Sequence, residues 1–214
     1  MRQIPNTFTW YARAFWSWPT NDTELERFNS WVADLDYALE RVEDFSICVQ
    51  AGGACGVWPA RLAQDFATVI TFEPDPENFM ALVANTRHLK NISALQHAVS
   101  DASGFGSLQR NDLEKDNAGA SYLTTGGEVS VVSIDDLNLP SCGLIQLNIE
   151  GREISALQGA EQTLRKYKPV VMIEEKPLPQ MADQGIDLLA ARRFLGSLGY
   201  QPVAAIHRDI VFIC

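Results

Sequence analysis

The chain has 214 residues, a mass of 23.7 kDa and a hydrophobic content of 46%, as expected for one α/β domain with a buried core. It carries 17 Lys and Arg against 27 Asp and Glu, so its formal net charge at pH 7 is −10. This charge repels phosphate backbones and argues against a general nucleic-acid binder, although it does not exclude a single locally basic groove. The longest apolar runs have about five residues, against the roughly 20 that a membrane-spanning helix needs. We therefore expect no contact with a membrane.

The first residues are rich in aromatic side chains, but they do not resemble a secretory signal. Arg13 interrupts the apolar run and no small-residue cleavage site follows it, which favours a cytoplasmic location. The aromatic residues are Phe8, Trp10, Tyr11, Phe15, Trp16 and Trp18. Packing against the core is the simplest expectation, and covering an acceptor pocket or contacting a partner subunit are the alternatives.

Apolar residues at steps of three and four predict an amphipathic helix over 24–42. We therefore divide the chain into an N-terminal segment, 1–45, that packs on or covers the core, and a main domain, 46–214.

The main domain alternates short apolar runs with helical patterns. Strands are predicted at 47–49, 68–72, 92–99, 144–149 and 169–174, and helices at 58–66, 77–88, 153–166 and 186–198. Buried strands joined by helices indicate a parallel sheet that is covered on both faces.

Two segments depart from this alternation. Residues 101–127 are rich in Gly, Asp, Asn and Ser, and they predict a weak hairpin and a mobile loop before a run at 129–132. Near the C-terminus, runs at 203–206 and 210–213 flank a turn and predict an antiparallel hairpin that closes the sheet.

The cysteines do not predict a disulfide or a zinc site. Cys48, Cys55, Cys142 and Cys214 form no CxxC pair and no metal-type cluster, so we expect reduced and mostly buried thiols.

A glycine-rich turn follows the first predicted strand of the main domain. Gly52 and Gly56 allow a tight turn and the approach of a ligand, and the next helix offers unpaired N–H groups. Glu73 follows Gly52 by about 20 residues, the spacing that places a carboxylate under ribose hydroxyls. The pattern is not GxGxxG, so a nicotinamide enzyme is less favoured. The alternative to a nucleotide site is a tight strand-to-helix turn that binds no ligand. The presence of Glu73 at the expected spacing makes this alternative less favoured.

Polar residues also follow the strand at 144–149. Asn148 and Glu150 stand where ligands bind in open α/β sheets, at the carboxyl edge. In the alternative interpretation, Asn148 is a turn former, and Glu150 and Glu153 belong to a solvated first helical turn.

Three ordered blocks resemble the FkbM-type class I methyltransferases, which use S-adenosylmethionine. The blocks are VQAGGACG at 49–56, FEPDPENF at 72–79, and IDDL at 134–137 leading into IQLNIEGRE at 145–153. AVSD at 98–101 and VMIE at 171–174 are similar to the family as well. The resemblance covers about 47–175. It implies a Rossmann-like seven-stranded sheet, mostly parallel with a reversed C-terminal strand, helices on both faces, and methylation of hydroxyl oxygens.

The resemblance also implies a site. The residues expected to bind S-adenosylmethionine are Gln50, Gly52, Gly53, Gly56, Glu73, Pro74, Ala98, Val99 and Asn148. The residues expected to act in catalysis are Glu150, Glu174 and Asn148, with Glu175 as a further acid. Oxygens of these four residues would suit Mg²⁺, an optional cofactor. We expect His97 to be a hydrogen-bonded structural histidine rather than a catalytic one.

Three positions depart from the family pattern. Members usually carry an acid at Gln50, a lysine at Gln146 and an aspartate at Asn148. A neutral Gln50 would weaken binding of the cofactor's ammonium by about 1–2 kcal/mol. Asn148 cannot act as a base, so one of the neighbouring glutamates would have to replace it.

The leading hypothesis is therefore O-methylation of a small-molecule or glycan hydroxyl. The alternative is a catalytically impaired methyltransferase-like domain that serves as a binding or assembly module, as the three lost charges suggest. Methyl transfer to protein or nucleic acid is a third hypothesis, which the acidic balance disfavours. A homo-oligomer is left open.

Overall fold

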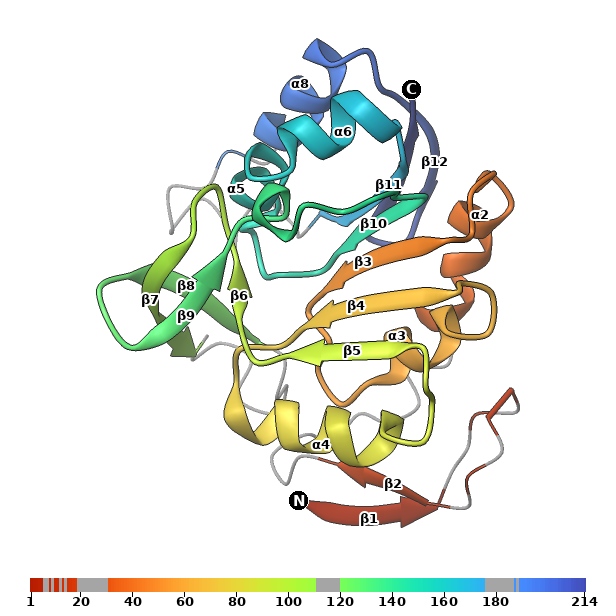
Figure 1. The fold of residues 1–214 in the computed structure, drawn as a ribbon, viewed down its shortest axis with the longest axis vertical. Helices are drawn as coiled ribbons and strands as arrows, with labels where there is room; N and C mark the ends of the chain where they lie inside the picture. The colour runs from red at the N-terminus through yellow and green to blue at the C-terminus, as the bar shows by residue number, and fades with distance from the viewer. Residues whose placement is uncertain are drawn as a thin grey trace.

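Seven strands form the central sheet in the order β12-β13-β11-β10-β3-β4-β5 (Figure 1). The computed structural model describes residues 1–5, 8, 10–11, 13, 15–18, 31–110, 120–175, 187 and 189–214. The strands are β12 (Gln201–Ile206), β13 (Asp209–Ile213), β11 (Val170–Glu174), β10 (Leu144–Leu147), β3 (Ile47–Ala51), β4 (Thr68–Phe72) and β5 (Ile92–Leu95). The five strands from β11 to β5 are parallel, and β13 is antiparallel to both of its neighbours. The predicted fold class is confirmed, including the reversed C-terminal strand.

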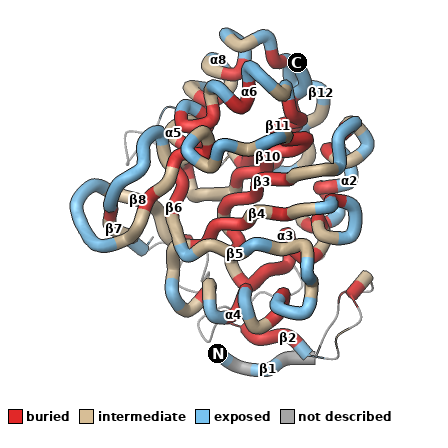
Figure 2. The backbone as a smooth tube through the Cα atoms, viewed as in Figure 1, coloured by how far each residue is buried: buried red, intermediate tan, exposed pale blue. Residues whose placement is uncertain are grey.

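The sheet is buried on both faces, as Figure 2 shows along its central strands. Cys48 and Met172 point into an apolar cluster with residues of α2 (Leu35–Leu39) and α3 (Val57–Leu62). Their neighbours Val49 and Ile173 point into a second cluster, on the opposite face. That face is covered by α5 (Glu153–Gln158), α6 (Glu161–Tyr167) and α8 (Leu189–Ser197). This alternation explains why the strands are continuously apolar in sequence.

Helix α4 (Pro76–Thr86) begins where the sequence predicts. Asp75 is its N-cap, and its Oδ1 accepts the N–H groups of Glu77 and Asn78 at 2.9 and 3.0 Å. Pro76 occupies the first turn, where its missing N–H costs nothing. This cap fixes the direction of the chain directly after Glu73.

Four strands form a second sheet beyond the carboxyl ends of the central strands, with the order β6-β9-β7-β8 (Figure 1). They are β6 (Ala98–Val99), β9 (Val129–Val132), β7 (Gly104–Arg110) and β8 (Ser121–Thr125). The prediction of one strand over 92–99 is wrong, because the chain leaves the central sheet after Leu95 and β6 pairs with β9 instead. The predicted hairpin is confirmed as β7 and β8. Residues 111–119 of the segment predicted to form a hairpin and a loop lie outside the described residues.

Two predicted helices differ in the structure. The helix expected over 153–166 is divided at Gly159, where an added Cβ would lie 2.1 Å from the carbonyl oxygen of Ser100. The close approach of that loop therefore separates α5 from α6. Of the helix expected over 24–42, residues 24–30 lie outside the described part of the chain. The remainder is interrupted by a turn at Asp34 before α2 begins.

Phe8, Tyr11, Trp16 and Trp18 of the N-terminal segment belong to the apolar core, whereas Phe15 is exposed. Strand β2 (Phe15–Trp18) pairs with β1 (Arg2–Pro5) and contacts α4, and Trp16 and Trp18 are fully buried. The buried amide of Asn85 accepts the N–H of Ser17 at 2.7 Å and donates to its carbonyl at 2.9 Å. The same amide donates to the carbonyl of Cys55 at 2.7 Å.

All four cysteines are free thiols, and three of them are buried, as expected. Among the helices that the structure describes, none has the length and apolar character needed to cross a membrane.

Candidate active site

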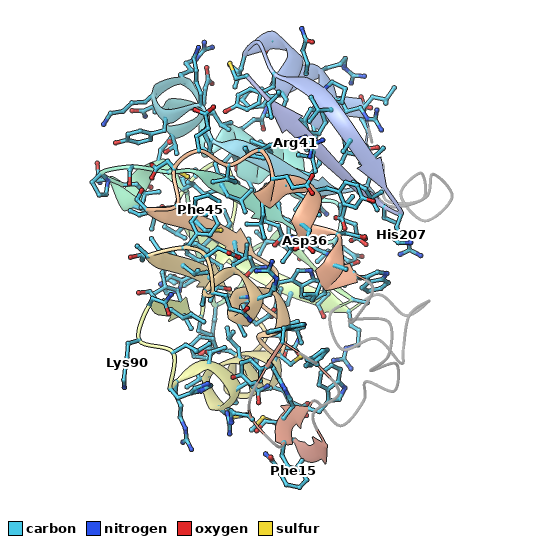
Figure 3. All side chains as sticks on the ribbon, turned by 90° about the vertical axis from the view of Figure 1, so that its right-hand side faces the viewer. Phe15, Asp36, Arg41, Phe45, Lys90 and His207 are labelled. Carbon is cyan, nitrogen blue, oxygen red and sulfur yellow. The ribbon has the colours of Figure 1, made fainter. Side chains whose placement is uncertain are left out.

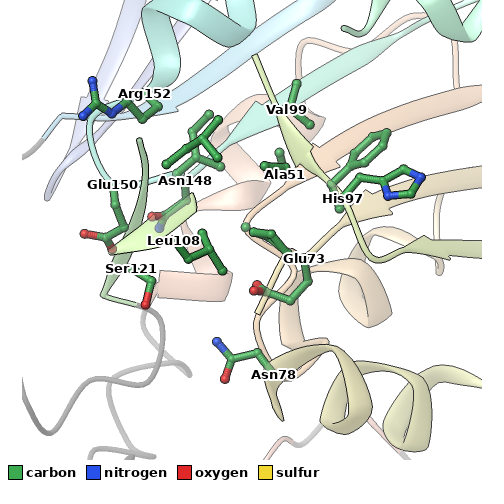
Figure 4. A pocket seen from close by; sticks show the side chains of 16 residues that line it. Ala51, Glu73, Asn78, His97, Val99, Leu108, Ser121, Asn148, Glu150 and Arg152 are labelled. Carbon is green, nitrogen blue, oxygen red and sulfur yellow. The ribbon is translucent and has the colours of Figure 1, made fainter. Parts of the chain in front are cut away.

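A cavity of about 510 Å³, partly open to solvent, lies between the carboxyl ends of β3, β4 and β10 and the second sheet. Figure 4 shows Glu73 and Asn78 on one side of it, and Asn148 and Glu150 on the other. Apolar residues complete the lining, among them Phe72, Pro74, Val99, Leu108 and Leu123. Apolar walls with a few polar groups are typical of sites for small molecules.

The glycine turn is attached to the end of β4. The N–H groups of Gly52 and Gly53 both donate to the carbonyl of Phe72, at 3.0 and 2.9 Å. Gly52 has a φ of +86°, and an added Cβ would lie 1.9 Å from the carbonyl oxygen of Asn148. Glycine is therefore required here by the packing of the turn against the end of β10.

Of the three glycines predicted to bind a cofactor, Gly52 lines the cavity. Gly53 and Gly56 pack against other parts of the protein. An added Cβ at Gly53 would lie 2.8 Å from the hydroxyl oxygen of Thr71, and at Gly56 2.9 Å from the Thr86 methyl group. Their role toward a cofactor stays a prediction, because protein packing already accounts for both.

Glu73 is only 5% exposed, and backbone donors hold its carboxyl group in place. Its Oε2 accepts the N–H of Ala54 at 2.7 Å, and its Oε1 accepts the N–H of Asp75 at 2.9 Å. Burial raises the pKa of Glu73 to about 7, although the two backbone hydrogen bonds oppose the shift. Each carboxylate oxygen keeps further acceptor capacity, so Glu73 is suited to bind two adjacent hydroxyl groups.

Pro74, Ala98 and Val99 line the same cavity, next to Glu73 and at the start of the second sheet. His97 lines it as well, and its Nδ1 lies 2.7 Å from the carbonyl oxygen of Gln96.

Gln50 is fully buried and is not among the residues that line the cavity. Its Oε1 accepts the hydroxyl of Thr71, and its Nε2 donates to the carbonyl of Gly52 at 3.1 Å. The Gln50 side chain therefore links the glycine turn to strand β4. The sequence analysis had predicted that it contacts the cofactor.

Gln146 is the register partner of Gln50 on the adjacent strand β10, and it is 1% exposed. Two of the three departures from the family pattern are thus neighbours. An acid and a lysine at these positions would place opposite charges side by side, and here two neutral amides replace them. The two substitutions leave no unbalanced charge in the sheet.

The segment after β10 has an unusual backbone. Glu150 has a φ of +59° and is followed by Gly151 at +87°, so a non-glycine residue adopts the left-handed region at the cavity wall. Glu153 holds this segment, because its Oε1 accepts the N–H of Ile149 at 2.9 Å. Glu153 is 6% exposed, and burial raises its pKa to about 7. The alternative prediction of a solvated Glu153 is wrong.

Glu174 and Glu150 line different cavities. Glu174 ends β11 and lines a smaller cavity of about 240 Å³, and Asn148 lines both. Glu175 faces elsewhere, because its two carboxylate oxygens accept from Nε and Nη2 of Arg192 at 2.6 and 2.7 Å.

These acids therefore do not converge around a magnesium ion. In the described ranges, no group of three or more His, Cys, Asp or Glu residues is arranged to hold a metal.

The sequence analysis missed the contribution of the β7–β8 hairpin. Leu108 and Leu123 are register partners on its two strands and both line the cavity, as does Ser121. Asn78 and Arg152 line it too, and both stand in the blocks that resemble the family, although no role was predicted for them. The hairpin residues had no sequence signal, because nothing local indicates that this segment folds back over the sheet edge.

Comparison with known proteins agrees with the fold. The hexuronic acid methyltransferase AglP of Haloferax volcanii is 25% identical over 141 residues, which are 63% of this chain and 58% of that protein. The crystal structure of an FkbM methyltransferase from Methylobacillus flagellatus KT has 21% identity and a TM-score of 0.56. That match covers 79% of this chain and 43% of the other.

The precorrin 8w decarboxylase of Methanobacterium thermoautotrophicum has 12% identity and a TM-score of 0.52, and the match covers 92% and 95% of the two chains. At these identities the solved structures show the fold alone. The chain also spans less than two thirds of the length of the curated relative and of the FkbM structure.

The family comparison is the most specific, because the model of the methyltransferase FkbM domain matches residues 59–202. This segment is more than half of the chain and includes Glu73, Asn148 and Glu174. The protein therefore belongs to the FkbM methyltransferase domain family.

Proposed function

We propose that this protein is an S-adenosylmethionine-dependent methyltransferase that methylates a hydroxyl oxygen of a small molecule or a glycan. The single observation that carries the proposal is the buried Glu73 carboxyl, held by two backbone N–H groups at the wall of a cavity that Asn148 also lines. The family membership supports the reaction class, and the relative named a hexuronic acid methyltransferase supports a sugar-type acceptor.

The lining residues fit S-adenosylmethionine. Glu73 would accept the two ribose hydroxyls, and Pro74 and Val99 would contact the adenine together with Leu108 and Leu123. Gly52 and Asn148 would lie beside the methionine part. When bound, the cofactor supplies a methyl group on a positively charged sulfur, and the carboxylate of Glu150 suits a cation there.

The protein's own contribution to transfer is to align the acceptor and to remove its proton. Asn148 can orient a hydroxyl group, because its amide both donates and accepts, but it cannot act as a base. Glu150 lines the larger cavity together with Asn148, and Glu174 lines the smaller one together with Asn148. These two acids are the candidates to accept the proton.

An impaired module is the second candidate function, and it rests on the lost charges at positions 50, 146 and 148. Gln50 and Gln146 are adjacent in the sheet, and Gln50 contacts Thr71 and Gly52 instead of the cavity. Neutralising this pair therefore removes no charge from the cavity lining. One departure, Asn148, remains there, which favours the enzyme over the module.

Calorimetric titration with S-adenosylmethionine and S-adenosylhomocysteine tests the first step. We expect both to bind, Glu73→Ala to lose most of the affinity, and Glu175→Gln, whose side chain faces Arg192, to keep it. Absence of binding to the unaltered protein would support the assembly module. The second step follows a labelled methyl group into alcohols, glycans and amines, and labelling of amines alone would contradict O-methylation.

A further inference from the structure

We propose that Arg152 is an anion-binding residue of the larger cavity and that it pairs with a carboxylate or phosphate group of a bound ligand. This inference deepens the proposed function and rests on it. Two ligands of a methyltransferase can supply such a group. One is the cofactor, through the carboxylate of its methionine part, and the other is an acidic acceptor.

The position of Arg152 in the cavity is the first argument. Figure 4 shows Arg152 and Glu150 on one side of the cavity, and Glu73 and Asn78 on the other. Among the described residues that line this cavity, Arg152 is the only Lys or Arg. A ligand that Glu73 holds by its ribose would therefore extend toward a positive charge on the opposite wall.

The guanidinium of Arg152 has no acidic partner, which is the second argument. Its Nε is buried without a hydrogen-bond partner, and Arg152 forms no ion pair with any residue that the structure describes. Its two Nη groups are not buried in this way, so they are the donors that a ligand can reach. By contrast, Arg61 and Arg192 both face carboxylates of the protein. In a chain with a net charge of −10, an arginine without an acid at a cavity wall is suited to pair with a ligand anion.

Tyr122 of β8 helps to hold this side chain at the cavity wall. The central carbon Cζ of Arg152 lies 5.6 Å from the centre of the Tyr122 ring. A cation–π contact attracts the charge without supplying a hydrogen-bond acceptor. The hydrogen-bonding capacity of the guanidinium therefore remains for a ligand, whose carboxylate or phosphate it can bind through two N–H groups.

Most backbone N–H groups of the glycine turn are already used, which is the third argument. Unpaired N–H groups in such turns are a common alternative site for anions. Here acceptors within the protein take the N–H groups of Gly52, Gly53, Ala54 and Gly56. The carboxyl groups of Glu73 and Glu150 line the same cavity and would repel an anion. A ligand anion would therefore depend on Arg152 for its positive partner.

Calorimetry on the full chain tests the cofactor as the source of the anion. The probes are S-adenosylhomocysteine and decarboxylated S-adenosylhomocysteine, which lacks only the carboxylate. If the cofactor supplies the anion, Arg152→Gln should weaken binding of the first probe about tenfold and leave binding of the second within about twofold. Arg152→Lys keeps the charge but loses the paired N–H donors, so its affinity should lie between those of the other two proteins.

NMR titration tests the acceptor as the source. The probes are inorganic phosphate and acetate, added to the chain saturated with S-adenosylhomocysteine, with sodium chloride of equal ionic strength as the blank. If the acceptor supplies the anion, at least one probe should shift the backbone amide resonances of Ser121 and Ile149, which line the cavity. Arg152→Gln should then weaken this binding about tenfold, with S-adenosylhomocysteine affinity unchanged.

Arg41→Gln is the matched control, because it removes the same charge outside both cavities. Figure 3 shows Arg41 beside α2, and its guanidinium donates to the carbonyl of Tyr37. Every affinity should stay within about twofold in this variant. Equal losses in Arg41→Gln and Arg152→Gln would reveal a general effect of net charge and would overturn the inference.

The remaining outcomes separate this inference from the proposed function. If a folded Arg152→Gln protein binds S-adenosylhomocysteine, phosphate and acetate as the unaltered protein does, the inference is overturned and the proposed function stands. Equal weakening of S-adenosylhomocysteine and its decarboxylated form also overturns it, because the lost affinity then does not involve the carboxylate. If the unaltered protein binds neither form, the proposed function fails, and the inference fails with it.

Discussion

Glu73 and Asp209 are both buried carboxyl groups at the edge of the central sheet, but the protein treats them differently. The two oxygens of Glu73 each accept a backbone N–H, from Ala54 and from Asp75. Oδ1 of Asp209 has no such donor within the described part of the chain, and acids surround it. Their pKa values are correspondingly raised to about 7 and about 8.

The difference shows how a buried acid can be kept ready for a ligand. Backbone donors fix Glu73 in one orientation and reduce the cost of its charge, so it can stay ionised near neutral pH when hydroxyl groups approach. Asp209 lacks this support, so its protonated form is favoured near neutral pH.

A new carboxylate beside the Thr71 hydroxyl, in the buried part of the central sheet, would break the comparison most severely. Gln50→Glu places a charge next to the carbonyl of Gly52, in a fully buried position. We expect the free energy of unfolding to fall by about 3–5 kcal/mol, because the buried charge has no opposite charge beside it. Adding Gln146→Lys on the neighbouring strand should recover much of this loss.

Urea denaturation of the two single variants and the double variant measures this coupling. A Gln50→Glu protein as stable as the unaltered one would show that the turn can solvate a charge. In that case the backbone donors of Glu73 would not explain why its carboxyl group differs from that of Asp209.

Removing the Glu73 carboxyl, which two backbone N–H groups hold in place, tests its role in cofactor binding. Glu73→Ala should weaken S-adenosylhomocysteine binding by about 2–4 kcal/mol, because charge-assisted hydrogen bonds to the ribose are lost. Calorimetry gives the affinity, and circular dichroism checks that the variant is folded. Unchanged affinity in a folded variant would remove Glu73 from the site.

The raised pKa of Glu73 predicts a pH dependence with opposite signs for folding and for binding. The folded protein binds the proton more tightly than the unfolded chain does, so this stabilisation is present below about pH 4.5 and is lost as the pH rises through about 7. Each such group changes the unfolding free energy by at most about 1.4 kcal/mol per pH unit.

Affinity for S-adenosylhomocysteine should instead rise through pH 7, because the ribose hydroxyls donate to the ionised carboxylate. Glu73→Gln serves as the control, because Glu153 and Asp209 also titrate with raised pKa values. The difference between the two proteins isolates Glu73. An affinity that falls with pH in the unaltered protein would contradict its assigned role.

The smallest effect on stability and binding is expected at Glu175, which lines neither of the two cavities. Glu175→Gln breaks a partly exposed ion pair with Arg192, so stability should change by about 1 kcal/mol or less. Binding of S-adenosylhomocysteine should stay within about twofold. A larger change would show that Glu175 contributes to the cofactor site.

The central sheet could be predicted because its signals are local. Apolar runs such as 68–72 and the closing hairpin at 201–213 each carry their own pattern, and the resemblance to the family orders them. Glu73 could be predicted for the same reason, because its place depends on one strand end and one turn.

Other parts of the site depend on contacts between distant segments. Leu108 and Leu123 reach the cavity only because the β7–β8 hairpin folds beyond the sheet edge. Gln50 was predicted to meet a ligand, but its direction is set by Thr71 on the adjacent strand. The division of one predicted helix at Gly159 follows from the approach of Ser100, which no helical pattern reveals.

Asn85 joins two parts of the molecule that are far apart in the sequence. Its one amide group holds both backbone groups of Ser17 and the carbonyl of Cys55, which lies in the glycine turn. Ser17 lies on β2 and is not among the residues that line the larger cavity. Tightening of the turn by a ligand would therefore slow hydrogen exchange at the Ser17 amide, so the N-terminal strand would report on a cavity that it does not touch.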